Sequence, residues 1–200
     1  MSRWIQPVTL QNDYVRLEPL EPDHHDALRN AAADGELWNL WYTSVPTPEN
    51  TVAYIEAALN ARETGGAMAF VVRDKASGGI VGSTRYCNVD ETHQRLEIGY
   101  TWYARRVQRS AVNTACKLLL LTHAFEQLNA IAVEFRTHWF NRTSREAIAR
   151  LGARQDGVIR NHQRAADGGF RDTVVFSIIE SEWPTVKRHL RDRLNRHSNW

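Results

Sequence analysis

Residues 95–125 read Arg-Leu-Glu-Ile-Gly-Tyr-Thr-Trp-Tyr-Ala-Arg-Arg-Val-Gln-Arg-Ser-Ala-Val-Asn-Thr-Ala-Cys-Lys-Leu-Leu-Leu-Leu-Thr-His-Ala-Phe. Residues 95–103 alternate apolar with polar side chains and are rich in aromatics, which predicts a β-strand. Gly99 interrupts the alternation, and a glycine inside a strand often marks a bulge or a close approach to the backbone. From Ser110 onward the apolar residues recur at helical spacing, which predicts a helix that Ser110 caps and that runs to about Leu128.

A cationic loop joins this strand to this helix. It carries Arg105, Arg106 and Arg109 and leads directly into the helix N-terminus. Unpaired backbone N–H groups and the positive end of the helix dipole attract anions, and guanidinium groups strengthen that attraction. A phosphate-bearing ligand therefore fits the loop. Charge and spacing alone leave open the alternative that the arginines form only a solvated rim.

The composition fits one globular domain. The 200 residues are 42% hydrophobic and 24% charged, with a formal net charge of +2, so we expect a full hydrophobic core. We expect this domain over residues 1–180 and a C-terminal amphipathic helix within 181–200, packed on it or extending from it. The balanced charge argues against a nucleic-acid-binding protein. The tail is locally basic, but acidic residues dilute it and favour a solvated helix face; they are Glu180, Glu182 and Asp192.

The cysteines and histidines give no sign of a disulfide or a metal site. Cys87 and Cys116 fall on a predicted strand and a predicted helix, and we interpret them as buried thiols of a reduced compartment. The histidines, including His24 and His25, lack a ligand spacing, so no metal is expected. No apolar run is long enough for export or for a membrane span, and we expect a cytoplasmic protein that does not contact membranes.

The remaining patterns predict a mixed order of elements: strand, two helices, three strands, helix, strand, helix, two strands, helix. Besides 95–103, the expected strands cover 15–20, 68–73, 79–87, 130–137, 153–162 and 171–179, and the last two form a hairpin around a polar loop at 165–169. The expected helices cover 24–33, 48–63, 110–128, 141–151 and 182–196. In the second helix we expect one buried face, made of Val52, Ile55, Ala58 and Leu59.

Three features together resemble a known family. They are Glu97-Ile98-Gly99-Tyr100 on the central strand, the loop at 105–113, and Asn141-Arg142-Thr143-Ser144 with Leu151-Gly152-Ala153 on the following helix. This chain resembles the GNAT superfamily of N-acetyltransferases, in particular the branch of the ribosomal-protein Nα-acetyltransferases. The resemblance covers about residues 8–180. It implies an α/β (α+β) fold: a central mixed, mostly antiparallel twisted sheet with a splayed central strand and helices on both faces.

The resemblance also implies acetyl-CoA, or another acyl-CoA, as co-substrate. The pantetheine would lie beside the splayed strand, against Ile98, Gly99, Tyr100 and Thr101. Asn141 and Ser144 would reach the donor from the next helix. The diphosphate would lie on the loop and the helix start, which hold Arg106, Gln108, Arg109, Ser110, Ala111, Val112, Asn113 and Thr114.

Two positions depart from the family pattern. Ala111 and Asn113 stand where the loop usually has glycines; alanine forfeits the freedom to adopt positive φ, whereas asparagine retains part of it. Ile148 matches the tyrosine that protonates the leaving thiolate in many members. We expect Ser144 to protonate the thiolate in its place. The alternative is that Ser144 is an ordinary solvent-facing helix serine.

An ammonium has no lone pair, so a base must take a proton from it before the amine can attack, and a donor must stabilise the oxyanion. Glu97 matches a position that supplies the base in some members, and its aromatic surroundings are expected to raise its pKa. The alternative is a structural ion pair of Glu97 with Arg95 or Arg136. Glu134, on the neighbouring strand, is the second candidate. The backbone N–H near Tyr100 would stabilise the oxyanion.

The family resemblance places the acceptor cleft between the first helices and the last hairpin. The dense aromatic run at 38–42 is interpreted as filling the core in preference to forming a ligand wall. The charged hairpin would engage a charged acceptor, although such hairpins are often only solvated. The candidate acceptor residues are Trp38, Trp41, Tyr42, Arg160, His162, Arg171 and Asp172.

Two functional classes stay open. The first is an acetyl-CoA-dependent N-acetyltransferase that acts on a protein or peptide N-terminus or on a small amine. The alternative is a GNAT-like module that binds acyl-CoA as a sensor or partner with little turnover. A homodimer is compatible with the exposed strand edges expected here.

Overall fold

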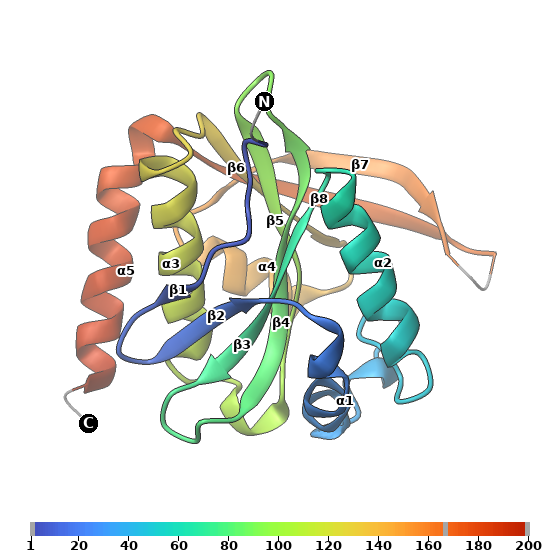
Figure 1. Cartoon of the computed structure of the whole chain (residues 1–200). Coiled ribbons are helices and arrows are strands. Elements are labelled where there is room, and N and C mark those ends of the chain that lie inside the picture. Colours follow the sequence, from blue (N-terminus) through green and yellow to red (C-terminus); the bar gives the residue numbers. More distant parts are fainter. Residues whose placement is uncertain (1–2, 166–167, 199–200) are drawn as a thin grey trace.

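The alternating segments join into a single sheet in the computed structural model, which describes residues 3–165 and 168–198 (Figure 1). Within these residues the sheet has eight strands in the order β1-β2-β3-β4-β5-β6-β8-β7. The strands are β1 Leu10–Gln11, β2 Val15–Pro19, β3 Met68–Asp74, β4 Ile80–Asp90, β5 Arg95–Tyr103, β6 Ala132–His138, β7 Arg154–Arg164 and β8 Phe170–Ile179. The α-helices are α1 His25–Ala33, α2 Thr51–Glu63, α3 Val112–Glu126, α4 Arg142–Ala149 and α5 Trp183–Ser198.

The predicted order of elements is confirmed except that a short strand, β1, precedes the first predicted strand, and β5 has the predicted bounds. The start of α3 was predicted too early, because Ser110 lies before the helix: its Oγ accepts the Val112 N–H at 3.3 Å and donates to the Val107 carbonyl at 2.6 Å. The predicted buried face of α2 is wrong at Val52, which is 50% exposed. In the predicted polar loop, residues 166 and 167 lie outside the described residues.

The sheet is antiparallel except between β5 and β6. These two strands pair in parallel only over Arg95–Glu97 and Ala132–Glu134. Beyond that point β5 continues beside β4, and β6 continues beside β8. The central strand is therefore splayed from its neighbour, as expected, and its backbone from Ile98 onward has no strand partner on the β6 side.

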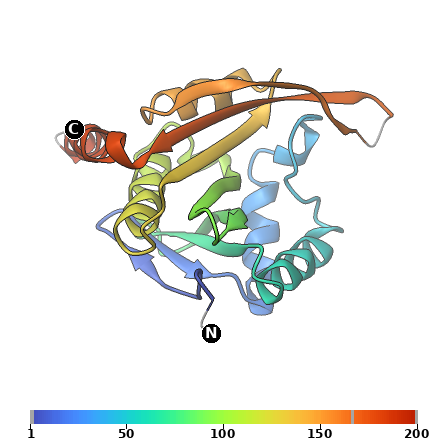
Figure 2. The same cartoon turned by 90° about the horizontal axis from the view of Figure 1, so that it is seen from above.

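Helices cover both faces of the sheet. Figures 1 and 2 show α1 and α2 on one side and α3 and α5 on the other. α1 packs on β4 and α2 on β3, whereas α3 packs on β2 and β6 and supports α5. Figure 2 also shows that the β7–β8 hairpin extends well beyond the helices. The four apolar α5 residues within the described part are buried, namely Trp183, Val186, Leu190 and Leu194.

Candidate active site

A bulge lies in β5 where the strand leaves β6. Arg85 pairs with Gly99 and Ser83 with Trp102, so β5 has one residue more than β4 in this interval. Tyr100 takes up the extra residue with a φ of 50°. A β-bulge bends its strand, and this one coincides with the splay. The glycine-interrupted alternation therefore marks a real bulge.

Gly99 makes room for the carboxylate of Glu97. A Cβ at Gly99 would lie 2.9 Å from Glu97 Oε1 and 3.1 Å from Cys87 Sγ. Any other residue there would displace the carboxylate or the thiol. A glycine in a strand lets another group come close to the backbone, and here that group is the carboxylate of Glu97, the first candidate base.

Glu97 is 7% exposed and lies one residue before the splay opens. Burial raises its pKa; the hydrogen bond from Asn88 and the charge of Arg136 oppose the shift without cancelling it. Asn88 Nδ2 donates to Oε2 at 2.6 Å, and Arg136 Nε lies 3.5 Å from the same oxygen. Both recorded contacts engage Oε2, which leaves Oε1 to accept a proton.

Glu134, the second candidate base, is held by two arginines. Its oxygens lie 2.5 Å from Arg95 Nη2 and 2.9 Å from Arg136 Nη2. Burial raises its pKa, but the hydrogen bonds from these arginines outweigh that effect and leave the pKa lowered. Glu134 is therefore a weaker base than Glu97. Of the two alternative partners of Glu97, Arg95 contacts Glu134 and Arg136 contacts both carboxylates.

The cationic loop is anchored at one arginine. The Arg106 guanidinium donates to Asp34 at 2.7 Å and to the Ile80 carbonyl at 3.4 Å. Gln108 Nε2 donates to the Tyr103 carbonyl at 3.0 Å. Among the described residues, Arg105 and Arg109 have no ion-pair partner. Arg109 is exposed and lies directly before the α3 N-terminus.

The expected loss of glycine freedom at Ala111 is not found. Ala111 has a φ of −65°, and Asn113 lies inside α3, so neither position needs positive φ. The left-handed residue of the loop is Arg109, with a φ of 62°. The first N–H groups of α3 have no partner within the helix and point out of its end, as in other helices that bind anions.

Asn141 and Ser144 form the start of α4. Asn141 Oδ1 accepts the Ser144 N–H at 3.0 Å, which caps the helix and occupies that oxygen. Ser144 is half-buried, and its hydroxyl has no recorded hydrogen bond within the described chain. Ile148, which matches the family tyrosine, is 8% exposed and belongs to the core.

Lys117 lies beneath the bulge, from the second turn of α3. It is 4% exposed, and its Nζ donates to Thr101 Oγ1 at 2.7 Å and to Thr84 Oγ1 at 3.4 Å. Burial lowers its pKa to about 8. Its ammonium thus contacts β4 and β5 near the splay from the α3 side.

An aromatic cluster lies at the end of β6. Trp41 is 67% exposed, so the core interpretation is wrong for this residue. Its ring contacts His138 at 4.8 Å, Tyr42 at 5.5 Å and Phe140 at 6.0 Å between centroids. Trp38 instead packs, partly buried, against the core. The exposed Trp41 and Phe140 therefore form an open wall that the half-buried Tyr42 and the buried His138 support.

The charged side chains of the hairpin largely bind one another. Arg160 Nε lies 3.1 Å from Asp172 Oδ2, and the Asn161 N–H donates to Asp172 Oδ1 at 2.7 Å. His162 Nδ1 lies 3.1 Å from Thr173 Oγ1. Arg160, His162 and Asp172 thus stabilise the hairpin itself.

Sequence reasoning missed four residues at this site: Arg85, Lys117, His138 and Phe140. A signal existed for Lys117, which places a long cation directly before four leucines in a helix that is expected to be buried, whereas Arg85 follows the polar Ser83 and Thr84 and gives no such signal. His138 and Phe140 follow the end of a predicted strand, a position where ligand-binding residues often gather.

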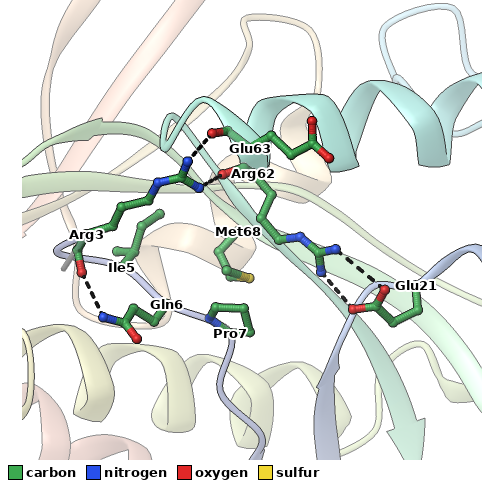
Figure 3. A pocket seen from close by; sticks show the side chains of 8 residues that line it. All are labelled: Arg3, Ile5, Gln6, Pro7, Glu21, Arg62, Glu63 and Met68. Carbon is green, nitrogen blue, oxygen red and sulfur yellow. Dashed lines mark hydrogen bonds and ion pairs between the residues drawn. The ribbon is translucent and has the colours of Figure 1, made fainter.

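Other features lie outside this site. A hollow of about 380 Å³ between the N-terminal segment and the end of α2 is lined by side chains that bind nearby groups: Arg3 donates to backbone carbonyls of α2, and Arg62 pairs with Glu21 at 2.8 Å (Figure 3).

In residues 3–165 and 168–198 no three potential metal ligands gather. No helix in these ranges has the length and apolar character to span a membrane. Burial raises the pKa of Cys87 and Cys116, which makes both thiols unreactive.

Known proteins share this architecture and part of the sequence. The family described as "Acetyltransferase (GNAT) domain" matches residues 15–154. A curated Bacillus subtilis (strain 168) protein, named "Putative ribosomal N-acetyltransferase YdaF", is 25% identical over 182 residues, 88% of this chain and 97% of that protein. A crystal structure of a "putative acetyltransferase" from T. thermophilus has 34% identity and a TM-score of 0.83, over 96% of this chain and 99% of that one.

A more distant structure shares the fold alone. Mycobacterium smegmatis RimJ, solved in complex with CoA-disulfide, has 20% identity and a TM-score of 0.80, over 96% of this chain and 97% of that one. The family match extends over well more than half of the sequence and includes β5, the cationic loop and α4. The chain therefore belongs to the GNAT family of N-acetyltransferases, whose general reaction is acetyl transfer.

Proposed function

We propose that this protein transfers an acetyl group from acetyl-CoA to a primary amine by direct attack of the amine on the thioester. The observation that carries the proposal is the position of Glu97. A buried carboxylate with a raised pKa lies where the sheet opens, next to a bulge that frees strand backbone. An acetyl-transfer site needs a base beside such an opening.

The residues present fit an acyl-CoA donor. The β5 backbone at Ile98–Thr101 lacks a strand partner on one side, so an extended amide-bearing arm can hydrogen-bond there. The α3 N-terminus and the exposed Arg109 suit a diphosphate. Ser110, Ala111, Val112, Asn113 and Thr114 supply the nearby backbone.

Each step of the transfer has a candidate residue. Glu97 takes the proton that the amine loses as the C–N bond forms, directly or through one water. The Tyr100 N–H donates to the oxygen that becomes negative. As the C–S bond breaks, Ser144 gives its hydroxyl proton to the sulfur and regains one from solvent.

The acceptor is proposed to be a protein or peptide N-terminus or a small amine. The name of the Bacillus relative supports a protein acceptor. The open aromatic wall at Trp41 supports an acceptor that extends beyond the amine, because exposed aromatic clusters often bind partners.

The test measures thiol release from acetyl-CoA with a panel of amines. We expect at least one amine to increase release, and Glu97→Gln to lower kcat/KM by about 10²- to 10⁴-fold. CoA binding is followed in parallel by thermal shift. A protein that binds CoA but releases no thiol with any amine would be an acyl-CoA sensor, and the enzyme proposal would fail.

A further inference from the structure

Arg85 is a buried cation that has no counter-ion among the described residues. It lies in the middle of β4, opposite Gly99 of β5, and is 6% exposed. Its Nε and Nη2 make no hydrogen bond to any described residue. The guanidinium lies over two aromatic rings, 5.2 Å from the Tyr54 centroid and 4.2 Å from that of Tyr100.

The ring contacts do not satisfy this group. They attract the cation through the faces of the rings but accept none of its N–H hydrogens in the plane. Buried arginines are normally paired, because an uncompensated charge in a protein interior is destabilising. Water can accept from these hydrogens, but only an anion also neutralises the charge. The described chain therefore supplies neither hydrogen-bond acceptors for Nε and Nη2 of Arg85 nor a counter-ion for its charge.

A second cation, Arg171, lies near enough to Glu97 and Tyr100 to interact with them electrostatically. Arg171 of β8 donates from Nε to Thr173 Oγ1 at 3.1 Å and has no ion-pair partner among the described residues. Burial lowers its pKa, and the nearby Glu97 and Tyr100 oppose that shift. Arg136 differs, because Glu134 and Glu97 already bind it. Two guanidinium groups that have no ion-pair partner among the described residues thus lie near Tyr100, and Arg171 is also near the candidate base.

We infer that the acceptor is an amine that carries a carboxylate close to its amino group, and that Arg85, assisted by Arg171, binds this carboxylate while Glu97 receives the amine. The inference rests on the proposed acetyltransferase function. The two unpartnered nitrogens of Arg85, Nε and Nη2, form the edge of the guanidinium that holds a carboxylate through two parallel hydrogen bonds.

The test uses acceptor pairs that differ only in a carboxylate. Asp-Ala-Ala amide is compared with Asn-Ala-Ala amide, and free alanine with alaninamide. The first pair places the carboxylate on a side chain and the second on the α-carbon. The comparison therefore shows which of the two carboxylates the protein recognises. We expect kcat/KM to favour the carboxylate in at least one pair by about 10- to 100-fold, mainly through KM.

Substitution of Arg85 is expected to remove this preference. In Arg85→Met the ratio within the favoured pair should fall at least about 10-fold, and Arg85→Lys should retain part of it. Arg150→Met, which removes an exposed arginine paired with Glu146 on α4, is the matched control and should keep the wild-type ratio. Equal rates within both pairs, or a preference that survives Arg85→Met, would overturn the inference and leave the acetyltransferase proposal intact.

A binding measurement covers the case in which no acceptor is turned over. Calorimetry with the CoA-loaded protein compares the acetylated products of the same pairs. Selective binding of a carboxylate product that is lost in Arg85→Met supports the anion site even if the enzyme proposal fails, and the absence of selectivity overturns it. Thermal unfolding without ligand checks folding: Arg85→Met is expected to unfold at the same or a higher temperature, because it removes an unpaired buried charge.

Discussion

At the scale of single residues, the environment of Glu97 raises the pKa of its carboxyl group while two neighbours stabilise the ionised form. Burial raises the pKa, whereas Asn88 and Arg136 stabilise the carboxylate. A base is most effective when its pKa lies near the working pH. The surroundings of Glu97 therefore suit proton removal at neutral pH better than those of Glu134, whose pKa is lowered.

The pH profile of the reaction tests this role. Glu97 must be ionised to act, so kcat/KM should rise with pH through its pKa, at a higher pH than for an ordinary glutamate. Glu97→Gln should abolish this acid limb and leave a rate lower by about 10²- to 10⁴-fold. Steady-state kinetics from about pH 5 to about pH 9 measure both effects, and Glu91→Gln, in an exposed turn, is the control. An unchanged acid limb in Glu97→Gln would exclude Glu97 as the base.

Lys117 is expected to lower stability at neutral pH. Its pKa falls from 10.5 to about 8 in the folded protein, which corresponds to about 3 kcal/mol. Between these values the unfolded chain binds more protons, so the Lys117 contribution to stability becomes more favourable as pH rises. Lys117→Met should therefore raise the free energy of unfolding at pH 7 by about 2 kcal/mol, since Thr84 and Thr101 can still bind each other.

This gain should shrink toward pH 10. Urea denaturation at several pH values measures it, with Lys75→Met as the exposed control that changes little at any pH. A constant difference between Lys117→Met and wild type across this range would contradict the lowered pKa.

The local sequence pattern predicts only some of these residue-level features. The bulge was foreseeable from Gly99, because glycine in an alternating strand has few other uses. The contacts of Glu97 were not, because Asn88 and Arg136 reach it from other strands, and strand register follows from the whole sheet. The pairing of Arg106 with Asp34, 72 positions apart, is likewise invisible in the loop sequence.

At the scale of elements, the arginines of the loop before α3 have different surroundings. Arg106 fastens the loop to Asp34, and Arg109 is exposed beside the helix end. The prediction of strand, loop and helix came from periodicity alone. The exact start of α3 did not, because the Ser110 hydroxyl turns back toward the Val107 carbonyl.

Charge reversal at Arg109 tests the anion site. Arg109→Glu should weaken CoA binding by about 10- to 100-fold, less at high salt, because it places a negative charge beside a diphosphate. Calorimetric titration with CoA at two salt concentrations measures this. Arg29→Glu, on the exposed face of α1, should bind CoA as the wild type does. Unchanged affinity in Arg109→Glu would exclude the loop as the diphosphate site.

At the scale of the whole molecule, α5 is part of the core. Trp183 stacks on Phe125 at 5.3 Å between centroids, and its Nε1 donates to Glu126 at 2.7 Å. The spacing of apolar residues predicted this buried face because a helix with one apolar stripe must cover something. What it covers, α3, depends on the chain path and could not be read from the helix.

Truncation of one α5 side chain should therefore destabilise the entire fold. Leu190 is fully buried, so Leu190→Ala should lower the free energy of unfolding by about 2–5 kcal/mol. Leu40→Ala removes the same atoms from a residue that is 44% exposed and should cost well under half as much. Urea denaturation compares the two, and equal losses would show that α5 contributes little to the core.

The short ladder between β5 and β6 has a consequence for backbone dynamics. Within the described residues, the two halves of the sheet are connected by the short ladder at Arg95–Glu97 and by the bond from the Ile131 N–H to the Gln94 carbonyl, so the amides just beyond Glu97 lack strand protection on that side. A ligand arm that hydrogen-bonds to Ile98–Thr101 would act as a substitute strand. Deuterium uptake should then slow in this segment when the gap is filled, and the two halves of the sheet should become one cooperative unit.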